Sequence, residues 1–245
     1  MLRGLERLEF HLWLLRAEEP AFNRLLQAAP QILPTVEMER SGVLISGKAR
    51  NNFMARRAFV RTVLSQYASV SPADWTIGVD SDGKPEVIAP KSNAPLFFSL
   101  SRSVGLVACL VGSDRELGLD VETIDQTINV EAIADQYLAP AEARFLTDLP
   151  AAHRLKAFLK LWTLKESYLK ARGVGLSLPT EGFCFSCDAA EIELAGEPGK
   201  WCFRIIEPDP QHVAAIALPR TSSEKEDKWR RNVTIDIKFL AHDAA

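Results

Sequence analysis

The longest helical pattern in the sequence, Leu155–Ala171, carries a carboxylate in the middle of its apolar face. At roughly 100° per residue, five apolar side chains fall on one stripe that must be buried against another element: Leu155, Phe158, Leu159, Trp162 and Leu169. Glu166 lies in the centre of that stripe, and Lys170 lies four residues later at its edge. A buried carboxylate is costly unless it is paired or binds a metal ion. The pattern therefore predicts either an ion pair with Lys170 or a cation site.

A second acidic motif lies upstream, in the strand-like run Glu116–Ile124. Successive side chains of a strand point to opposite faces, so Asp120 and Glu122 share one face. Two carboxylates placed in this way repel each other unless a cation or solvent separates them. A solvated edge strand would explain the pair alone. Together with Glu166, however, the pair predicts a site for a hard cation, Mg²⁺ or Mn²⁺, because every donor is an oxygen.

Strand-like and helical patterns alternate along the chain and predict an α+β fold. The expected strands cover residues 8–15, 75–79, 86–88, 96–100, 106–112, 116–124, 183–186, 191–194, 201–206, 212–218 and 233–240. The expected helices cover 47–67, 130–137 and 155–171, with one more beginning at Pro140. The polar triplet Ser101-Arg102-Ser103 falls between two strands. We expect an N-terminal half over residues 1–115, a C-terminal half over 116–220, and a charged linker and tail over 221–245.

Composition excludes several classes of protein. The net charge of −3 gives no global attraction to nucleic acid or membrane, so we expect neither as a partner. Hydrophobic residues make up 47% of the chain, which argues against disorder. No signal-peptide pattern opens the sequence, and four cysteines do not suggest a disulfide scaffold. We therefore expect a cytoplasmic protein.

The two acidic motifs and several flanking segments resemble the 4′-phosphopantetheinyl transferases of the larger, surfactin-synthetase-activating type. The specific signature is Gly118-Leu-Asp-Val-Glu122 followed by Trp162-Thr-Leu-Lys-Glu-Ser-Tyr-Leu-Lys170. Further similar segments occur in the same order: LEFHLWLL at the start, Arg56-Arg57, Gly83-Lys84-Pro85, FFSLSRS at 97–103 and GVGLSLP at 173–179. The resemblance covers nearly the whole chain up to Leu218.

The resemblance implies two similar α+β halves related by a pseudo-two-fold axis, with coenzyme A held in the cleft between them. Such an enzyme transfers the 4′-phosphopantetheine arm of coenzyme A to a serine of an acyl or peptidyl carrier protein and releases adenosine 3′,5′-bisphosphate. Asp120, Glu122 and Glu166 then correspond to the Mg²⁺ ligands. Glu166, or a water that it holds, takes the serine proton, and Lys170 stabilises the leaving oxygen. A cleft completed within one chain favours a monomer.

The contacts to coenzyme A implied by the resemblance are Arg57, Lys84, Ser101, Arg102 and Lys165. Arg102 is a departure, because the family usually has histidine after this serine. A solvated basic face is the competing explanation for these cations. Two other functions stay open at this point: a metal-dependent nucleotide phosphohydrolase, and a coenzyme A- or carrier-binding module whose activity has decayed. The carrier's pathway is not evident from the sequence.

Overall fold

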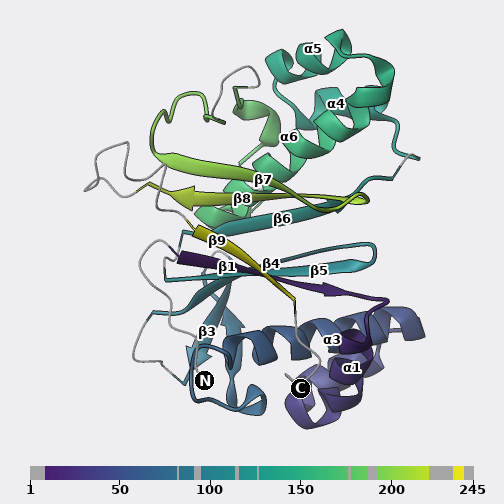
Figure 1. The fold of residues 1–245 in the computed structure, drawn as a ribbon, viewed down its shortest axis with the longest axis vertical. Coiled ribbons are helices and arrows are strands. Elements are labelled where there is room, and N and C mark those ends of the chain that lie inside the picture. Colours follow the sequence, from purple (N-terminus) through teal and green to yellow (C-terminus); the bar gives the residue numbers. More distant parts are fainter. Residues whose placement is uncertain are drawn as a thin grey trace.

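The computed structural model describes residues 9–81, 83–90, 95–113, 116–125, 127–175, 178–186, 192–220 and 234–239. Two β-sheets face each other across the middle of the molecule, and helices cover their outer sides (Figure 1). This arrangement confirms the α+β fold class. None of the described helices is both long enough and apolar enough to cross a membrane.

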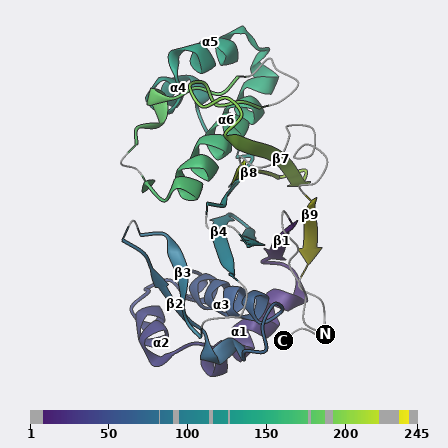
Figure 2. The ribbon, with the colours of Figure 1, turned by 90° about the vertical axis from the view of Figure 1, so that its left-hand side faces the viewer.

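The lower sheet of Figure 1 and its covering helices come from the first half of the chain, except for one strand from residues 234–239. Its strands are β1 (Glu9–Arg16), β4 (Phe97–Ser103), β5 (Leu106–Gly112) and β9 (Thr234–Phe239), in the order β4-β5-β1-β9. The helices are α1 (Pro20–Ile32), α2 (Thr35–Gly42) and α3 (Gly47–Leu64). A hairpin of β2 (Thr76–Val79) and β3 (Pro85–Ala89) lies beside α3 (Figure 2). A short 3-10 turn, Pro72–Asp74, precedes the hairpin.

The second half builds an antiparallel sheet in the order β6-β8-β7, from β6 (Gly118–Thr123), β7 (Trp201–Asp209) and β8 (His212–Pro219). Helices α4 (Val130–Tyr137), α5 (Pro140–Asp148) and α6 (Ala151–Arg172) cover its outer side. Another 3-10 turn spans Thr180–Gly182. Helix α6 ends at Gly173, whose φ of 72° is a left-handed conformation that glycine adopts without strain.

Three apolar cores stabilise this arrangement. One lies between α1, α3 and the first sheet, and a second lies between α6 and the second sheet. The third fills the space between the two sheets and draws side chains from both halves, among them Phe10, Leu12, Leu110, Leu119 and Ile216. Because the two sheets share this buried core, the halves pack as one unit.

The structure corrects several expectations about the chain. Strand β4 continues through Ser101-Arg102-Ser103, which were expected to lie between strands. The expected strands 183–186 and 191–194 are reduced to a single bridge between Phe185 and Leu194. Residues 221–233 lie outside the described part, but β9 does not form a separate tail: it pairs parallel to β1 in the sheet of the first half.

Gly118 opens β6 where α6 packs directly on the strand. A Cβ at this position would lie 1.9 Å from the carbonyl oxygen of Ser167 and 2.6 Å from the backbone nitrogen of Ala171. Both atoms belong to the helix backbone, so a side chain here would have to push α6 away from β6. The first residue of the acidic strand motif is therefore required by packing.

We expect Gly118→Ala to lower the free energy of unfolding by about 3 kcal/mol or more, the upper end of the usual range for overpacking. Urea unfolding followed by tryptophan fluorescence measures this. Gly47→Ala is the matched control, because a Cβ at Gly47 meets nothing within 4 Å. Equal stability of the two variants would show that α6 can move away from β6 without cost.

Candidate active site

Three serines of β4 lie where the two halves meet, along the line of contact between β4 and β6, which we call the seam. Their hydroxyl oxygens accept hydrogen bonds from alternate backbone N–H groups of β6: Ser99 from Leu119 at 3.1 Å, Ser101 from Val121 at 3.2 Å, and Ser103 from Thr123 at 2.8 Å. These side chains satisfy donors that a neighbouring strand's backbone would satisfy in a continuous sheet. The seam thereby places β4 directly beside the acidic strand.

Asp120 is the most enclosed carboxylate of the site, with 4% of its surface exposed. Its Oδ1 accepts hydrogen bonds from Lys170 Nζ at 2.6 Å and from Ser101 Oγ at 2.9 Å. Lys170 also donates to Ser101 Oγ at 3.1 Å. The lysine of α6 thus directs its ammonium to the neighbouring strand rather than to Glu166 on its own helix. The other oxygen of Asp120, Oδ2, is buried and has no partner.

Glu122 lies next along the same face of β6. Its Oε1 accepts a hydrogen bond from Trp162 Nε1 of α6 at 3.3 Å, and its Oε2 accepts one from Ser103 Oγ at 3.3 Å. The ring of Tyr137 packs edge-on against Trp162, with 4.9 Å between the centroids. The sequence had assigned Trp162 only to the apolar stripe of its helix. Indole, however, carries one N–H donor, and here that donor orients a carboxylate.

Burial acts on all three carboxylates, and repulsion acts on two of them. Burial raises the pKa of Asp120, although Lys170 and Ser101 partly oppose it. Burial and then the charge of Asp120 raise the pKa of Glu122. Burial, the charge of Asp120 and that of Glu122 raise the pKa of Glu166, against the opposing charge of Lys170. The charge of Asp120 therefore disfavours the charged forms of Glu122 and Glu166, and the ammonium of Lys170 opposes this effect at both.

These residues fit a hard divalent cation by their chemistry. All donors are carboxylate oxygens, Lys170 compensates only part of the charge of the cluster, and Asp120 Oδ2 is a buried acceptor with no hydrogen-bond partner among the described residues. Within the part of the chain that the structure describes, no three His, Cys, Asp or Glu side chains are already gathered into a metal site. The carboxylates would thus have to draw together around the ion.

A basic cavity of about 360 Å³ adjoins this cluster and is lined by Arg56, Arg102, Ser101, Asp120 and Lys170, together with Leu100. Arg56 and Arg102 also line a neighbouring cavity of about 400 Å³, which extends along α3 to Lys48 and Phe53. Burial, followed by the charges of Arg102, Arg57 and Arg40, lowers the pKa of Arg56 to about 10. Cations crowded in this way favour an anionic ligand.

Arg57 and Arg56, adjacent on α3, have different surroundings. Glu37 of α2 holds Arg57 Nη2 at 3.0 Å and Arg61 Nη2 at 3.2 Å, both through Oε1. Arg57 thus keeps a carboxylate partner, whereas Arg56 faces Arg102 across the cavity. The sequence assigned a role to Arg57 and none to Arg56. The helical pattern places both on α3 but does not show which strand each one faces.

Lys84, expected at a nucleotide phosphate, reaches across the seam between the halves. Its Nζ donates to the carbonyl oxygens of Leu117 at 3.0 Å and Ala171 at 3.1 Å. It also lines a cavity of about 230 Å³ together with Lys170, Gly173 and other residues. Lys84 therefore joins the hairpin to the end of α6 in this structure, and its contact with coenzyme A stays a prediction.

The structure does not support the expected contact of Lys165 with coenzyme A. Its side chain is fully buried and paired with Glu142 of α5 at 2.7 Å. Its ammonium also donates to the carbonyl oxygens of Thr180 and Phe183. Glu142 in turn accepts the backbone N–H of Phe185 at 2.8 Å. Lys165 is thus a structural residue that fastens the segment after α6 to the helix.

Comparisons with known proteins connect the whole arrangement to one family. The sequence model of the 4′-phosphopantetheinyl transferase superfamily matches residues 116–217. The 4′-phosphopantetheinyl transferase HetI of Nostoc sp. is 32% identical over 219 residues, covering 86% of this chain and 87% of that protein. The 4′-phosphopantetheinyl transferase Sfp of Bacillus subtilis is 29% identical over 160 residues, covering 64% and 69% respectively. AcpT of Salmonella typhimurium is 29% identical over 157 residues, covering 61% and 77%.

Proposed function

Because this chain belongs to the 4′-phosphopantetheinyl transferase superfamily, we propose that it works as an enzyme of the larger, surfactin-synthetase-activating type. It transfers the 4′-phosphopantetheine arm of coenzyme A to a serine of an apo carrier protein. The serine oxygen bonds to the phosphorus that carries the arm. The bond from that phosphorus to the leaving oxygen breaks, and adenosine 3′,5′-bisphosphate departs. Support for the larger type comes from the two halves in one chain and from coverage of 87% of HetI.

The observation that carries the proposal is the partly compensated carboxylate cluster, in which Asp120 Oδ2 is buried and has no hydrogen-bond partner among the described residues. Asp120, Glu122 and Glu166 would hold Mg²⁺ or Mn²⁺. The bound ion supplies charge neutralisation at the pyrophosphate oxygens, where negative charge develops on transfer. The Arg56–Arg102 cavity beside it would take the anionic part of coenzyme A.

Two residues of α6 would assist the proton movements. Glu166 is a carboxylate beside the proposed ion, and we assign it the role of proton acceptor for the serine hydroxyl. Glu166 acts either directly or through a water that it orients. Lys170, which already donates to Asp120 and Ser101, is placed to stabilise the leaving oxygen. Since the site draws on both halves of one chain, we propose a monomer, and we propose a cytoplasmic location.

Intact-mass spectrometry of an apo carrier protein with coenzyme A and Mg²⁺ tests the function. Transfer adds the mass of one phosphopantetheine group to the carrier protein. Free adenosine bisphosphate with an unmodified carrier would instead indicate a hydrolase. Binding of coenzyme A without either product would indicate a binding module. Comparing carrier proteins from different pathways in this assay identifies the one that the enzyme serves.

Arg102 is expected to bind the 3′-phosphate of coenzyme A in place of the family's usual histidine. Arginine is permanently charged and offers two parallel N–H donors to a phosphate. We expect Arg102→Ala to raise KM for coenzyme A roughly 10- to 100-fold, which corresponds to a charged hydrogen bond of ~1.5–3 kcal/mol. The KM for 3′-dephospho-coenzyme A, which lacks this phosphate, should change much less.

The matched comparison for this prediction is the pH dependence of Arg102→His. A histidine binds phosphate best when protonated, so the KM of that variant should rise as pH increases past ~6.5. The wild-type KM should show no such rise. Equal losses on both substrates in Arg102→Ala would mean that Arg102 does not contact the 3′-phosphate.

A further inference from the structure

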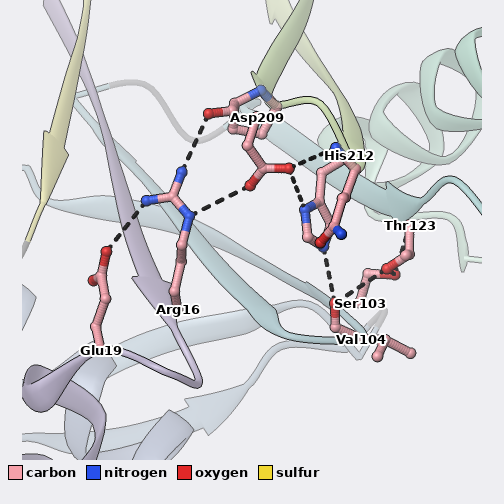
Figure 3. Close-up of polar contacts among 9 residues, drawn as sticks. Arg16, Glu19, Ser103, Val104, Thr123, Asp209 and His212 are labelled. Atoms are coloured by element: carbon pink, nitrogen blue, oxygen red, sulfur yellow. Dashed lines mark hydrogen bonds and ion pairs between the residues drawn. The ribbon is translucent and has the colours of Figure 1, made fainter.

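A separate polar network closes the rim where the two halves meet (Figure 3). It joins the β4–β5 turn, the β7–β8 turn and the end of β1. His212, which is 5% exposed, stands at its centre. Its Nδ1 lies 2.8 Å from Asp209 Oδ1, and its Nε2 lies 2.8 Å from the carbonyl oxygen of Val104.

Both atoms that face the His212 ring are hydrogen-bond acceptors. Burial alone would raise the pKa of Asp209, but hydrogen bonds from His212, the backbone N–H of Gln211 and Arg16 lower it, so this side chain is a carboxylate. A carboxylate and a carbonyl both require donors. The two ring nitrogens lie at hydrogen-bond distance from these acceptors, one on each side of the ring.

Arg16 fastens this pair to β1. Its Nε donates to Asp209 Oδ2 at 3.4 Å, and its Nη2 donates to the carbonyl oxygen of Pro208 at 3.2 Å. Its Nη1 pairs with Glu19, at the start of α1, at 3.3 Å. The Asp209 carboxylate of the second half is thus paired with a cation of the first half.

The network continues from Val104 to the carboxylate cluster. Thr123 Oγ1 lies 3.2 Å from the carbonyl oxygen of Val104 and 2.7 Å from Ser103 Oγ, and Ser103 Oγ lies 3.3 Å from Glu122 Oε2. Thr123 Oγ1 donates to the carbonyl oxygen of Val104, and Ser103 Oγ donates to Glu122 Oε2. Ser103 Oγ also contacts both the hydroxyl and the backbone N–H of Thr123. This relay of contacts joins Val104 to the carboxylate.

We propose that His212, Asp209 and Arg16 form a clasp that locks the two halves at this rim and, through Thr123 and Ser103, positions Glu122 for metal binding. The clasp rests on the proposed function, since it assumes that Glu122 is a metal ligand. Its members are positioning residues, because they act on Glu122 through Thr123 and Ser103 and do not contact the reacting atoms.

Binding of Mn²⁺ alone, measured by calorimetry or electron paramagnetic resonance, tests the clasp without the reaction. His212→Phe keeps a ring and removes both ring nitrogens, and with them the contacts to Asp209 and Val104. We expect its affinity for Mn²⁺ to fall about 10-fold, the lower end of the usual cost of losing an outer-shell partner of a metal ligand. The KM for coenzyme A should stay near the wild-type value, because the clasp does not reach the Arg56–Arg102 cavity. Amide hydrogen exchange in the β4–β5 turn should become faster.

His212→Gln retains one donor and should recover part of the affinity. His153→Phe, at an exposed position of α6, is the matched control and should bind Mn²⁺ like the wild type. Thr123→Val interrupts the relay but leaves the clasp intact, so its affinity should fall without faster exchange at the rim. If His212→Phe does not fold, the Mn²⁺ affinity of Thr123→Val still tests whether these contacts position Glu122.

Unchanged Mn²⁺ affinity in His212→Phe or Thr123→Val would overturn the clasp while leaving the proposed function standing, provided that the wild type transfers phosphopantetheine. A wild type that neither transfers the group nor binds Mn²⁺ would overturn both. A variant that loses stability but keeps its metal affinity would show that His212 has only a structural role.

Discussion

Asp120→Asn should lower the rate of phosphopantetheine transfer about 1,000-fold, equivalent to ~4 kcal/mol of transition-state stabilisation. The substitution keeps the size of the side chain and its bonds to Ser101 and Lys170 but removes the charge. An amide oxygen is a weaker ligand for Mg²⁺ than a carboxylate. The variant should therefore also need more Mg²⁺ for half-maximal activity, and mass spectrometry of the carrier protein at graded Mg²⁺ concentrations measures both effects.

Asp125→Asn is the matched control. Asp125 follows β6 on the same segment, but its carboxylate is exposed and bonds only locally, to Thr127. This variant should keep wild-type activity and metal dependence. If Asp120→Asn showed wild-type dependence on Mg²⁺, Asp120 would not be a metal ligand. The carboxylate cluster would then need another explanation, such as a structural pair with Lys170.

The sequence predicted the parts of this fold that depend on local pattern. Alternation identified the acidic strand, and the 3.6-residue period identified α6, on which Glu166 is half-buried. The period did not show where Lys170 would point, since an (i, i+4) spacing allows an ion pair with Glu166. Packing of α6 on β6 brings Asp120 closer, and the more deeply buried carboxylate takes the ammonium.

The features that were missed depend on contacts between distant segments. The pairing of β9 with β1 joins Glu9 to Thr234, and no periodic pattern encodes such a partner. Lys165 was expected to contact coenzyme A, but its side chain is buried in an ion pair with Glu142 of α5. The serines of β4 appeared to be a polar connection, because only the adjacent β6 backbone shows that their hydroxyls replace strand pairing. Local sequence patterns predict which face of a helix or strand a residue lies on. They do not predict which distant segment packs against that face.

Glu166→Gln should stabilise the metal-free protein while reducing transfer by a similar ~1,000-fold. Burial and the neighbouring carboxylates raise the pKa of Glu166 in the folded state. A raised carboxyl pKa means that the folded state binds the proton more tightly than the unfolded state does. Stability therefore falls as pH rises from the ordinary pKa of a glutamate to the folded value. Glutamine removes this penalty, and because solvent partly screens Glu166, we expect a rise in Tm of only about 2 °C at neutral pH.

Two changes of condition separate this explanation from a general packing effect. At a pH below the ordinary pKa of glutamate, the wild type is protonated as well, so the difference in Tm should disappear. Added Mg²⁺ should stabilise the wild type by binding the folded state and stabilise Glu166→Gln much less, which reverses the order of the two melting temperatures.

Glu207→Gln is the control, because its change in Tm at neutral pH should have the opposite sign. Hydrogen bonds from Lys156 and Lys160 lower the pKa of Glu207, so its charge favours the folded state above that pKa. Its replacement should slightly lower Tm at neutral pH and leave the response to Mg²⁺ unchanged. If Glu166→Gln behaved in the same way, Glu166 would be an ordinary surface carboxylate. A cluster that is costly without its ion and stable with it explains why three carboxylates lie together around the ammonium of Lys170.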